Sequence, residues 1–236
     1  MKKINWNEFW INWRNIESEK EEDLFFQVGK TINKMPVSEE VFNEAFEDIV
    51  KKLELKKSDS LLEMCCGNGL VSLPLSLLSK KIYAFDFTPH LINSAKKFKQ
   101  GENIEYLVGD AKSDFFSLFS FEDLPQKFLM NDALAYFTPD DLKLIIENIV
   151  NKTPTFLFYL TGIPNNDLKW NFYNTDERKK RYLELEEKKD DFFDGIGRWW
   201  KVEEIQKIAQ DLNLKCTVQN QNSIISNFRM DVLFER

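Results

Sequence analysis

LLEMCCGNGL, residues 61–70, is the stretch that decides the fold of this 236-residue chain. An apolar run carrying Glu63 leads into a turn with Gly67 and Gly69, and further apolar residues follow. Glycines let the backbone come close to a bound nucleotide-like ligand, and the first turn of a helix offers unpaired N–H groups. The stretch therefore predicts a strand, a glycine turn and a helix that together bind such a ligand.

Strand and helix patterns alternate on both sides of this turn. Ser38 can cap a helix before it, and Thr88-Pro89 and Thr138-Pro139 can open two more helices after it. Short apolar runs, read as strands, lie at 60–64, 82–86, 104–108, 128–130 and 155–160. This alternation is typical of a parallel sheet with helices on both faces.

The last part of the chain follows a different pattern. A helical run from Val202 to Leu212 precedes two strand-like runs, 215–219 and 228–234, which a short polar link joins. Such a hairpin makes the last strand antiparallel. We therefore predict an α/β fold, a three-layer sandwich whose seven-stranded, mostly parallel sheet has an antiparallel last strand.

Two further acids follow the glycine turn at the ends of strands. Asp86 stands 23 residues after Glu63, and Asp110 stands another 24 residues on. A carboxylate in the position of Asp86 can accept both ribose hydroxyls of an adenosine. Taken singly, an acid at a strand end is more often a cap or turn residue, so the order of the three acids matters more than any one of them.

This order resembles the class I, Rossmann-like S-adenosylmethionine-dependent methyltransferases of the small-molecule type. Their motif I is usually written acidic-x-Gly-x-Gly-x-Gly, and the chain departs from it at Cys65, where the first glycine is usual. The resemblance implies S-adenosylmethionine as cofactor and S-adenosylhomocysteine as product. It also implies a set of cofactor contacts at the strand ends: Glu63, Cys65, Gly67, Gly69, Asp86, Phe87, Asp110, Ala111 and Asn131.

Residues 131–136 occupy the place where this family meets the methionyl end of the cofactor and the substrate. Ala133 and Leu134 stand where the amino-methylating N-P-P-Y and D-P-P-Y motifs carry prolines, which disfavours nucleobase or glutamine methylation. His90, the one histidine, opens a helix beside the expected adenosine edge, which favours a surface or adenine-lining role over catalysis. We therefore expect Asp132 and Tyr136 to be the catalytic residues.

Two segments are expected to cover this site. Residues 1–37 form an N-terminal helical segment with an aromatic face that either packs on the sheet domain or closes over the site as a lid. As a lid it brings Gln27 and Lys30 to the cofactor and Trp10 to the substrate. The rest, 38–236, forms the methyltransferase domain. Within it, the inserted stretch at about 162–200, between the fifth strand and the last helix, is expected to be a substrate cap that contributes Arg198 and Trp199.

Composition restricts the partners. The 32 Lys and Arg against 39 Asp and Glu give a net charge of −7, which is the wrong sign for binding nucleic acid. Three cysteines and one histidine predict neither a disulfide framework nor a metal site. No apolar run approaches the ~20 residues of a membrane helix, so we expect a cytoplasmic protein without membrane contact. The oligomeric state stays open.

The predicted function is methyl transfer from S-adenosylmethionine to a small molecule, most simply to a hydroxyl of a metabolite or sugar derivative. N-methylation of a small amine is an alternative. A nicotinamide-dependent oxidoreductase is another, because Gly67-x-Gly69-x-x-Ser72 is one residue from the dinucleotide fingerprint. A non-catalytic module that keeps the adenosine pocket is the third.

Overall fold

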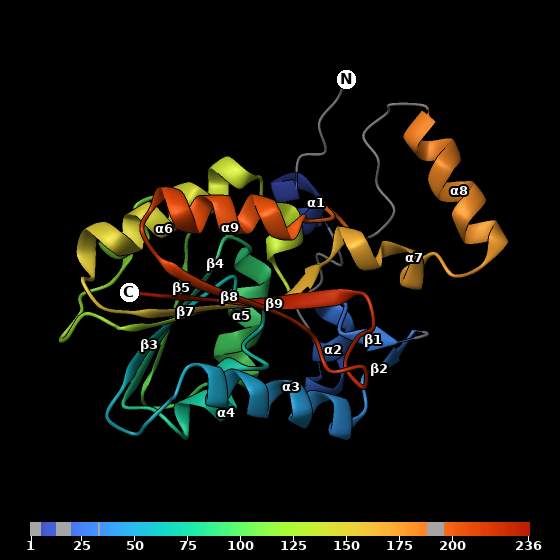
Figure 1. Cartoon of the computed structure of the whole chain (residues 1–236). Helices are drawn as coiled ribbons and strands as arrows, with labels where there is room; N and C mark the ends of the chain where they lie inside the picture. Colours follow the sequence, from blue (N-terminus) through green and yellow to red (C-terminus); the bar gives the residue numbers. More distant parts are fainter. Residues whose placement is uncertain (1–5, 13–19, 33, 188–195) are drawn as a thin grey trace.

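A seven-stranded sheet forms the centre of the protein, as the computed structural model shows for residues 6–12, 20–32, 34–187 and 196–236 (Figure 1). The strand order is β5-β4-β3-β6-β7-β9-β8, and β9 alone runs opposite to the other six strands. The strands are β3 (Ser60–Met64), β4 (Lys81–Asp86), β5 (Ile104–Val108), β6 (Lys127–Asn131), β7 (Leu157–Pro164), β8 (Lys215–Asn220) and β9 (Arg229–Glu235). The predicted sheet, with its antiparallel last strand, is confirmed.

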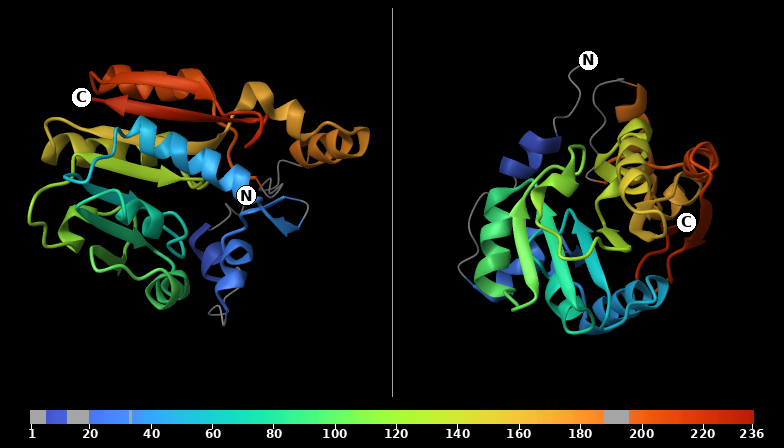
Figure 2. Two further views of the ribbon diagram at one scale, coloured as in Figure 1. Left: turned by 90° about the horizontal axis from the view of Figure 1, so that it is seen from below. Right: turned by 90° about the vertical axis from the view of Figure 1, so that its left-hand side faces the viewer.

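Helices cover both faces of this sheet and give the three predicted layers (Figures 1 and 2). One face packs against α3 (Glu39–Lys52), α4 (Ser72–Ser76) and α5 (Pro89–Phe98), and the other against α6 (Pro139–Lys152) and α9 (Val202–Asp211). The strands alternate accordingly, since Leu61 belongs to the core under α3 and Leu62 to the core under α6. Both faces of the parallel strands are therefore buried.

The helix starts follow the local sequence signals in two of three cases. The Ser38 hydroxyl accepts the Val41 N–H at the start of α3, and Thr138 and Asp141 form a capping box at the start of α6. Thr88 precedes α5 without a cap bond from its side chain, and the carboxylate of Asp86 accepts the Thr88 N–H instead. This departure ties the start of α5 to the end of β4.

Two elements differ in length from the sequence expectation. The helix α4 ends at Ser76 rather than near Ser79, and in this stretch the Ser76 and Ser79 hydroxyls donate to backbone carbonyls, an alternative to regular helix bonding. The strand β7 continues to Pro164 rather than ending at Leu160, because it resumes pairing with β9 after a register shift. Pairing with a distant strand leaves no local sequence signal.

The two segments outside the sheet contain short elements. Before α3 lie α1 (Trp6–Asn12), the 3-10 helix η1 (Glu21–Asp23), α2 (Leu24–Gln27) and a small ribbon of β1 (Thr31–Ile32) and β2 (Met35–Pro36). After β7 come η4 (Asn166–Leu168), α7 (Lys169–Phe172) and α8 (Asp176–Glu187). Residues 188–195 of the predicted cap lie outside the described residues. Within the described ranges, no helix is long and apolar enough to span a bilayer.

Candidate active site

The ends of β3, β4 and β5 bring the predicted cofactor residues together at one edge of the sheet. The Gly67 N–H donates to Asp86 Oδ2 at 3.0 Å, and the Gly109 N–H donates to the Asp86 carbonyl at 3.0 Å. The charges of Asp86, Asp110 and Glu63 all raise the pKa of the Cys65 thiol, after the larger effect of its burial. The three acids therefore lie near Cys65 at the start of the glycine turn, and this is the carboxyl edge where open parallel sheets bind ligands.

The glycine turn has a left-handed backbone at three positions. Gly67 has a φ of 57° and Gly69 of 77°, and a Cβ added at Gly69 would stand 2.5 Å from the hydroxyl oxygen of Tyr106. Cys65 has a φ of 55° although it carries a side chain. The left-handed region costs a non-glycine residue roughly 1–2 kcal/mol. This explains why glycine is usual where Cys65 stands.

Replacing Cys65 by glycine is expected to leave the free energy of unfolding unchanged or higher, because relief of the left-handed strain offsets the entropy that glycine adds to the unfolded chain. Urea unfolding measures it. Cys66→Gly is the matched control, since Cys66 is 9% exposed and its φ is not positive, and it should lose at least about 1 kcal/mol. Equal losses in the two variants would contradict the strain at Cys65.

Glu63 faces the protein interior behind the turn. Its side chain is 2% exposed, and Oε2 accepts the Ser72 hydroxyl at 2.5 Å, which ties β3 to the start of α4. Burial raises the pKa of Glu63 to about 7, against the lowering effect of the Ser72 hydrogen bond. Asp110 is more exposed, and its Oδ1 accepts the Lys112 N–H at 2.9 Å. Of these two acids, Asp110 is thus the more open to a ligand.

Glu63→Gln is expected to make the stability of the ligand-free protein less dependent on pH. The native pKa of about 7 lies above the ordinary 4.5, so the native state holds a proton that the unfolded state releases between these values. The free energy of unfolding therefore falls as the pH rises from about 4.5 to about 7, by up to about 3 kcal/mol from this group. Glutamine removes that contribution.

Urea unfolding of both proteins at about pH 5 and about pH 8 measures this difference. Asp231, whose pKa burial raises to about 6, adds a pH dependence of the same sign, but it is present in both proteins and cancels in the comparison. The exposed Glu102→Gln serves as the control and should behave as the wild type. Identical slopes for wild type and Glu63→Gln would show that Glu63 is ionised in the native state.

The segment around α2 crosses the glycine turn and is fixed to it by Asn68. The amide nitrogen of Asn68 donates to the Leu24 carbonyl at 2.8 Å and to Gln27 Oε1 at 2.9 Å. Gln27 in turn donates to the Ser94 hydroxyl of α5 at 3.0 Å and is 3% exposed. The structure therefore places Gln27 between the turn and α5. The sequence does not predict this role of Asn68, which stands between two glycines and has no other distinguishing feature.

Asp132, directly after β6, holds two cations. Its Oδ2 lies 2.8 Å from Lys30 Nζ, and its Oδ1 lies 2.6 Å from the Arg229 guanidinium. Burial by itself raises the pKa of Asp132, but the charges of Lys30 and Arg229 outweigh it and lower the pKa. Asp132 is therefore ionised at neutral pH. Lys30, expected at the cofactor, is here the partner of the predicted catalytic acid.

Gly162 makes room for Asp132. It has a φ of 74°, and a Cβ added there would overlap Asp132 Oδ1. The Gly162 N–H donates to Asp231 Oδ1 at 2.8 Å, and the Gln221 amide donates to the same oxygen at 2.8 Å. This buried group, from β7, β9 and the residue after β8, lies at the register shift of β7 beside Asp132.

Aromatic rings of α1 lie against Tyr136, in the 3-10 helix η3 (Leu134–Tyr136). The ring centroids of Trp6 and Trp10 are 4.8 and 5.3 Å from that of Tyr136. Burial raises the pKa of Tyr136 to about 12, so its phenol is protonated at neutral pH. The structure thus brings Trp10 to the predicted catalytic residue. Trp13, on the same expected aromatic face, lies outside the described residues.

The returning end of the cap packs on η3, and the side chain of Arg198 pairs with a residue of α9. The Arg198 N–H donates to the Ala135 carbonyl at 2.7 Å, while its guanidinium lies 2.6 Å from Glu204 Oε1. The indole of Trp200 donates to the Leu134 carbonyl at 3.0 Å. Trp199 belongs to an aromatic cluster of the cap with Phe172, Tyr173 and Phe228. The charge of Arg198 is therefore compensated by Glu204.

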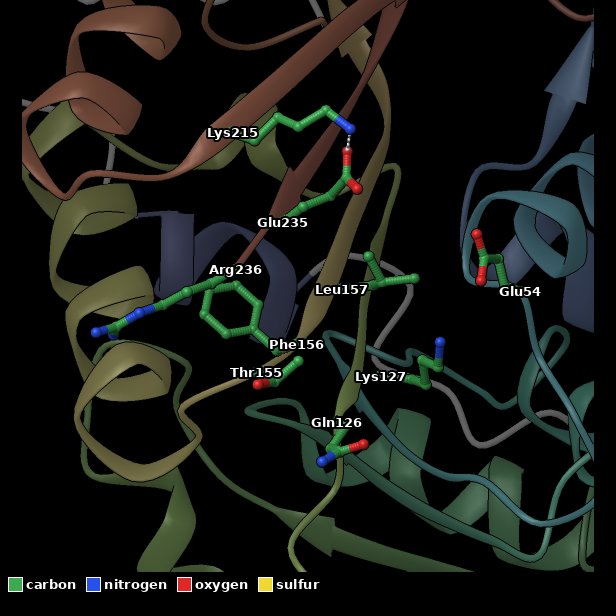
Figure 3. A pocket seen from close by; sticks show the side chains of 9 residues that line it. All are labelled: Glu54, Gln126, Lys127, Thr155, Phe156, Leu157, Lys215, Glu235 and Arg236. Atoms are coloured by element: carbon green, nitrogen blue, oxygen red, sulfur yellow. Dashed lines mark ion pairs between the residues drawn. The ribbon is translucent and has the colours of Figure 1, made fainter.

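An open pocket of roughly 420 Å³ lies at the other edge of the sheet (Figure 3). It is lined by residues at the amino ends of β6 and β7 and at the end of β9, including Lys127, Leu157 and the Lys215–Glu235 pair at 2.8 Å. Ligands of parallel sheets bind beyond the carboxyl ends of the strands, so this pocket is not the candidate site. Among the residues that the structure describes, no cluster of metal-ligating side chains was found.

Comparisons with known proteins point to one class of enzyme. Residues 61–153 match a family model described as a methyltransferase domain. A probable cobalt-precorrin-6B C(15)-methyltransferase (decarboxylating) of Methanococcus maripaludis is 41% identical over 76 residues, which cover 30% of this chain and 41% of that protein. An uncharacterized RNA methyltransferase of Clostridium tetani is 32% identical over 146 residues, covering 59% of this chain and 28% of that protein.

The fold has solved counterparts over nearly its whole length. The crystal structure of a magnesium protoporphyrin IX methyltransferase from Synechocystis, with bound S-adenosylhomocysteine, matches with a TM-score of 0.61 at 15% identity. The match covers 95% of this chain and 92% of that one. With the curated relatives above, by contrast, the matched stretch spans less than half of their length.

Proposed function

Because residues 61–153 match a methyltransferase domain and the chain has the class I, Rossmann-like fold, we propose that it transfers a methyl group from S-adenosylmethionine to a small molecule, at a hydroxyl of a metabolite or sugar derivative. The observation that carries the proposal is the meeting of four strand ends at one edge. The glycine turn, Asp86, Asp110 and Asp132 come from four successive parallel strands and lie at the carboxyl edge of the sheet.

The residues at this edge fit the cofactor. Gly67 and Gly69 have left-handed backbones, and a Cβ at either would press on Val28 or Tyr106, so the turn requires glycine at both positions. Asp86 accepts the two ribose hydroxyls and Asp110 the adenine amino group, with Phe87 and Ala111 beside the adenine. Asn131 and Cys65 lie toward the methionyl end. When bound, the cofactor supplies an activated methyl group.

The acceptor side depends on positioning and on the exclusion of water, because displacement at a sulfonium has a good leaving group. The N-terminal segment, residues 1–37, acts as a lid and the segment at about 162–200 as a cap. A base is needed for a neutral hydroxyl. Of the two predicted catalytic residues only Asp132 is ionised and able to take up a proton, and its lowered pKa makes it a weak base. Tyr136 keeps its proton and can donate a hydrogen bond to the acceptor.

A macromolecular acceptor is the less favoured alternative. One relative is named an RNA methyltransferase, but a net charge of −7 opposes the binding of a phosphate backbone. N-methylation of a small amine uses the same site and needs a base only if the amine is protonated. RNA carries many negative charges and a protonated amine carries a positive one, whereas the fold is the same for each acceptor. The charge of the acceptor therefore separates these alternatives better than the fold does.

Titration calorimetry with S-adenosylmethionine, S-adenosylhomocysteine and NADH tests the cofactor. We expect binding of the first two and none of NADH. NADH binding without binding of S-adenosylmethionine would overturn the proposal in favour of an oxidoreductase. Release of S-adenosylhomocysteine in the presence of a small-molecule library then tests transfer, and binding without release on any acceptor, RNA included, would indicate a non-catalytic module.

A further inference from the structure

Asp132 lies between two cations that come from opposite ends of the chain. Lys30 is 102 residues away in sequence and Arg229 is 97 residues away, yet each places a nitrogen within 2.8 Å of a different oxygen of the same carboxylate. The three side chains are partly buried, with exposed fractions of 17% for Lys30, 33% for Asp132 and 30% for Arg229. We call these three residues the Asp132 cluster.

The Asp132 cluster carries one more positive charge than negative charge. Partly buried charges are stable when each has an opposite partner, because desolvation penalises a charge without one. Here one carboxylate serves two cations. The imbalance is local, since the chain as a whole has a net charge of −7. The carboxylate of Asp231 lies nearby but is buried, and the Gly162 N–H and the Gln221 amide both donate to it. The partly exposed Asp132 cluster therefore presents its excess positive charge to a ligand.

The guanidinium of Arg229 has one donor that no described residue uses. Its Nε is buried and has no hydrogen-bond partner among the described residues, while one terminal nitrogen binds Asp132. A guanidinium binds carboxylates and phosphates through two parallel N–H groups, and Lys30 adds a single point charge. The guanidinium of Arg229 also lies 5.4 Å from the Phe228 ring centroid, which joins it to the aromatic cluster of the cap.

The predicted catalytic residue Tyr136 lies near the Asp132 cluster. Tyr136 ends the short loop that begins at Asp132, and Trp6 and Trp10 pack on its ring. A ligand that contacts both Tyr136 and Asp132 is therefore within reach of the Arg229 guanidinium, which binds Asp132. From these observations, and resting on the proposed function, we infer that the methyl acceptor carries an anionic group, a carboxylate or phosphate, and that Arg229 together with Lys30 binds it.

Two pairs of hydroxyl-bearing probes test the inference by calorimetry on the protein saturated with S-adenosylhomocysteine. Salicylate is compared with salicylamide and lactate with lactamide, so that each acid has a neutral counterpart of nearly the same shape. In at least one pair the acid should bind about tenfold or more tightly than the amide. Equal affinities in both pairs, or no binding of either acid, would overturn the inference.

Variants test whether Arg229 causes the preference for the acid over the amide. Arg229→Gln should reduce the preference for the acid to less than about twofold, and Lys30→Gln should reduce it in part, because Lys30 adds a charge without the second donor. Arg236→Gln, at the opposite edge of the sheet, is the matched control and should keep it. If Arg229→Gln does not fold, Lys30→Gln decides, and a preference that survives it intact contradicts the inference.

The methionyl carboxylate of the cofactor is the other anion that Arg229 could bind. In that case Arg229→Gln weakens S-adenosylhomocysteine about tenfold or more but leaves methylthioadenosine, which lacks the amino-acid part, unchanged; this result would overturn the assignment to the acceptor. The inference expects the affinity for S-adenosylhomocysteine to stay within about twofold. Failure of the wild type to bind S-adenosylhomocysteine would instead refute the proposed function itself.

Discussion

Gly162→Ala is expected to lower the rate of methyl transfer at least about a hundredfold, the loss that follows when a reacting group moves by roughly 1 Å. A Cβ at residue 162 would overlap Asp132 Oδ1, so the carboxylate has to leave its place between Lys30 and Arg229. The left-handed φ of 74° adds strain. We expect the free energy of unfolding to fall by at least about 2 kcal/mol.

Gly29→Ala is the control that separates the strain of a left-handed backbone from the overlap of the added Cβ with Asp132. Gly29 has a similar φ of 67°, but nothing lies within 4 Å of a Cβ added there. This variant should lose roughly 1 kcal/mol and no more, whereas Gly162→Ala should lose both stability and activity. Steady-state rates at saturating cofactor and urea unfolding measure the two effects. A Gly162→Ala protein with wild-type activity would show that Asp132 need not stay in place.

Asp86→Asn is expected to weaken S-adenosylmethionine binding by at least about tenfold and up to several hundredfold. A carboxylate that accepts both ribose hydroxyls makes charge-assisted hydrogen bonds, each with a net contribution of about 1.5–3 kcal/mol, and asparagine keeps the size but one acceptor oxygen. Calorimetry gives the dissociation constant. The exposed Asp123, which pairs with Lys80, provides Asp123→Asn as the control.

In the structure Asp86 also supports the glycine turn, and the experiment has to separate this role from cofactor binding. Its two carboxylate oxygens accept the N–H groups of Gly67 and Thr88 and so brace the glycine turn. A folded Asp86→Asn protein with an unchanged dissociation constant would mean that the brace is its whole role. An Asp86→Asn protein with a lower melting temperature but the dissociation constant of the wild type would lead to the same conclusion.

The sequence predicted what depends on local pattern. Strand and helix periodicity, the glycine turn and the acids at the strand ends need no knowledge of distant contacts, and they gave the sheet and the carboxyl edge. For Arg198 the sequence left two interpretations open, a substrate contact or a salt bridge with a nearby acid, and the structure pairs it with Glu204, six residues later.

Contacts between distant segments could not be predicted in this way. Arg229 reaches Asp132 because β9 is antiparallel, which puts the first residue of the last strand at the edge where the parallel strands end. The contact of Asn68 with Gln27 depends on how the N-terminal segment folds back over the turn. Neither position has a spacing or a composition that singles it out, so tertiary structure was needed to find both.

The long sequence separations within the Asp132 cluster have a kinetic consequence. Joining residue 132 to residues 30 and 229 closes two loops of 102 and 97 residues, and loop-closure entropy makes such contacts slow to form. The inner strands β3, β4 and β6 connect through shorter stretches of chain. We therefore expect the sheet to acquire its amide protection early in refolding, and the ability to bind a ligand at Asp132 to appear in a later, separate phase.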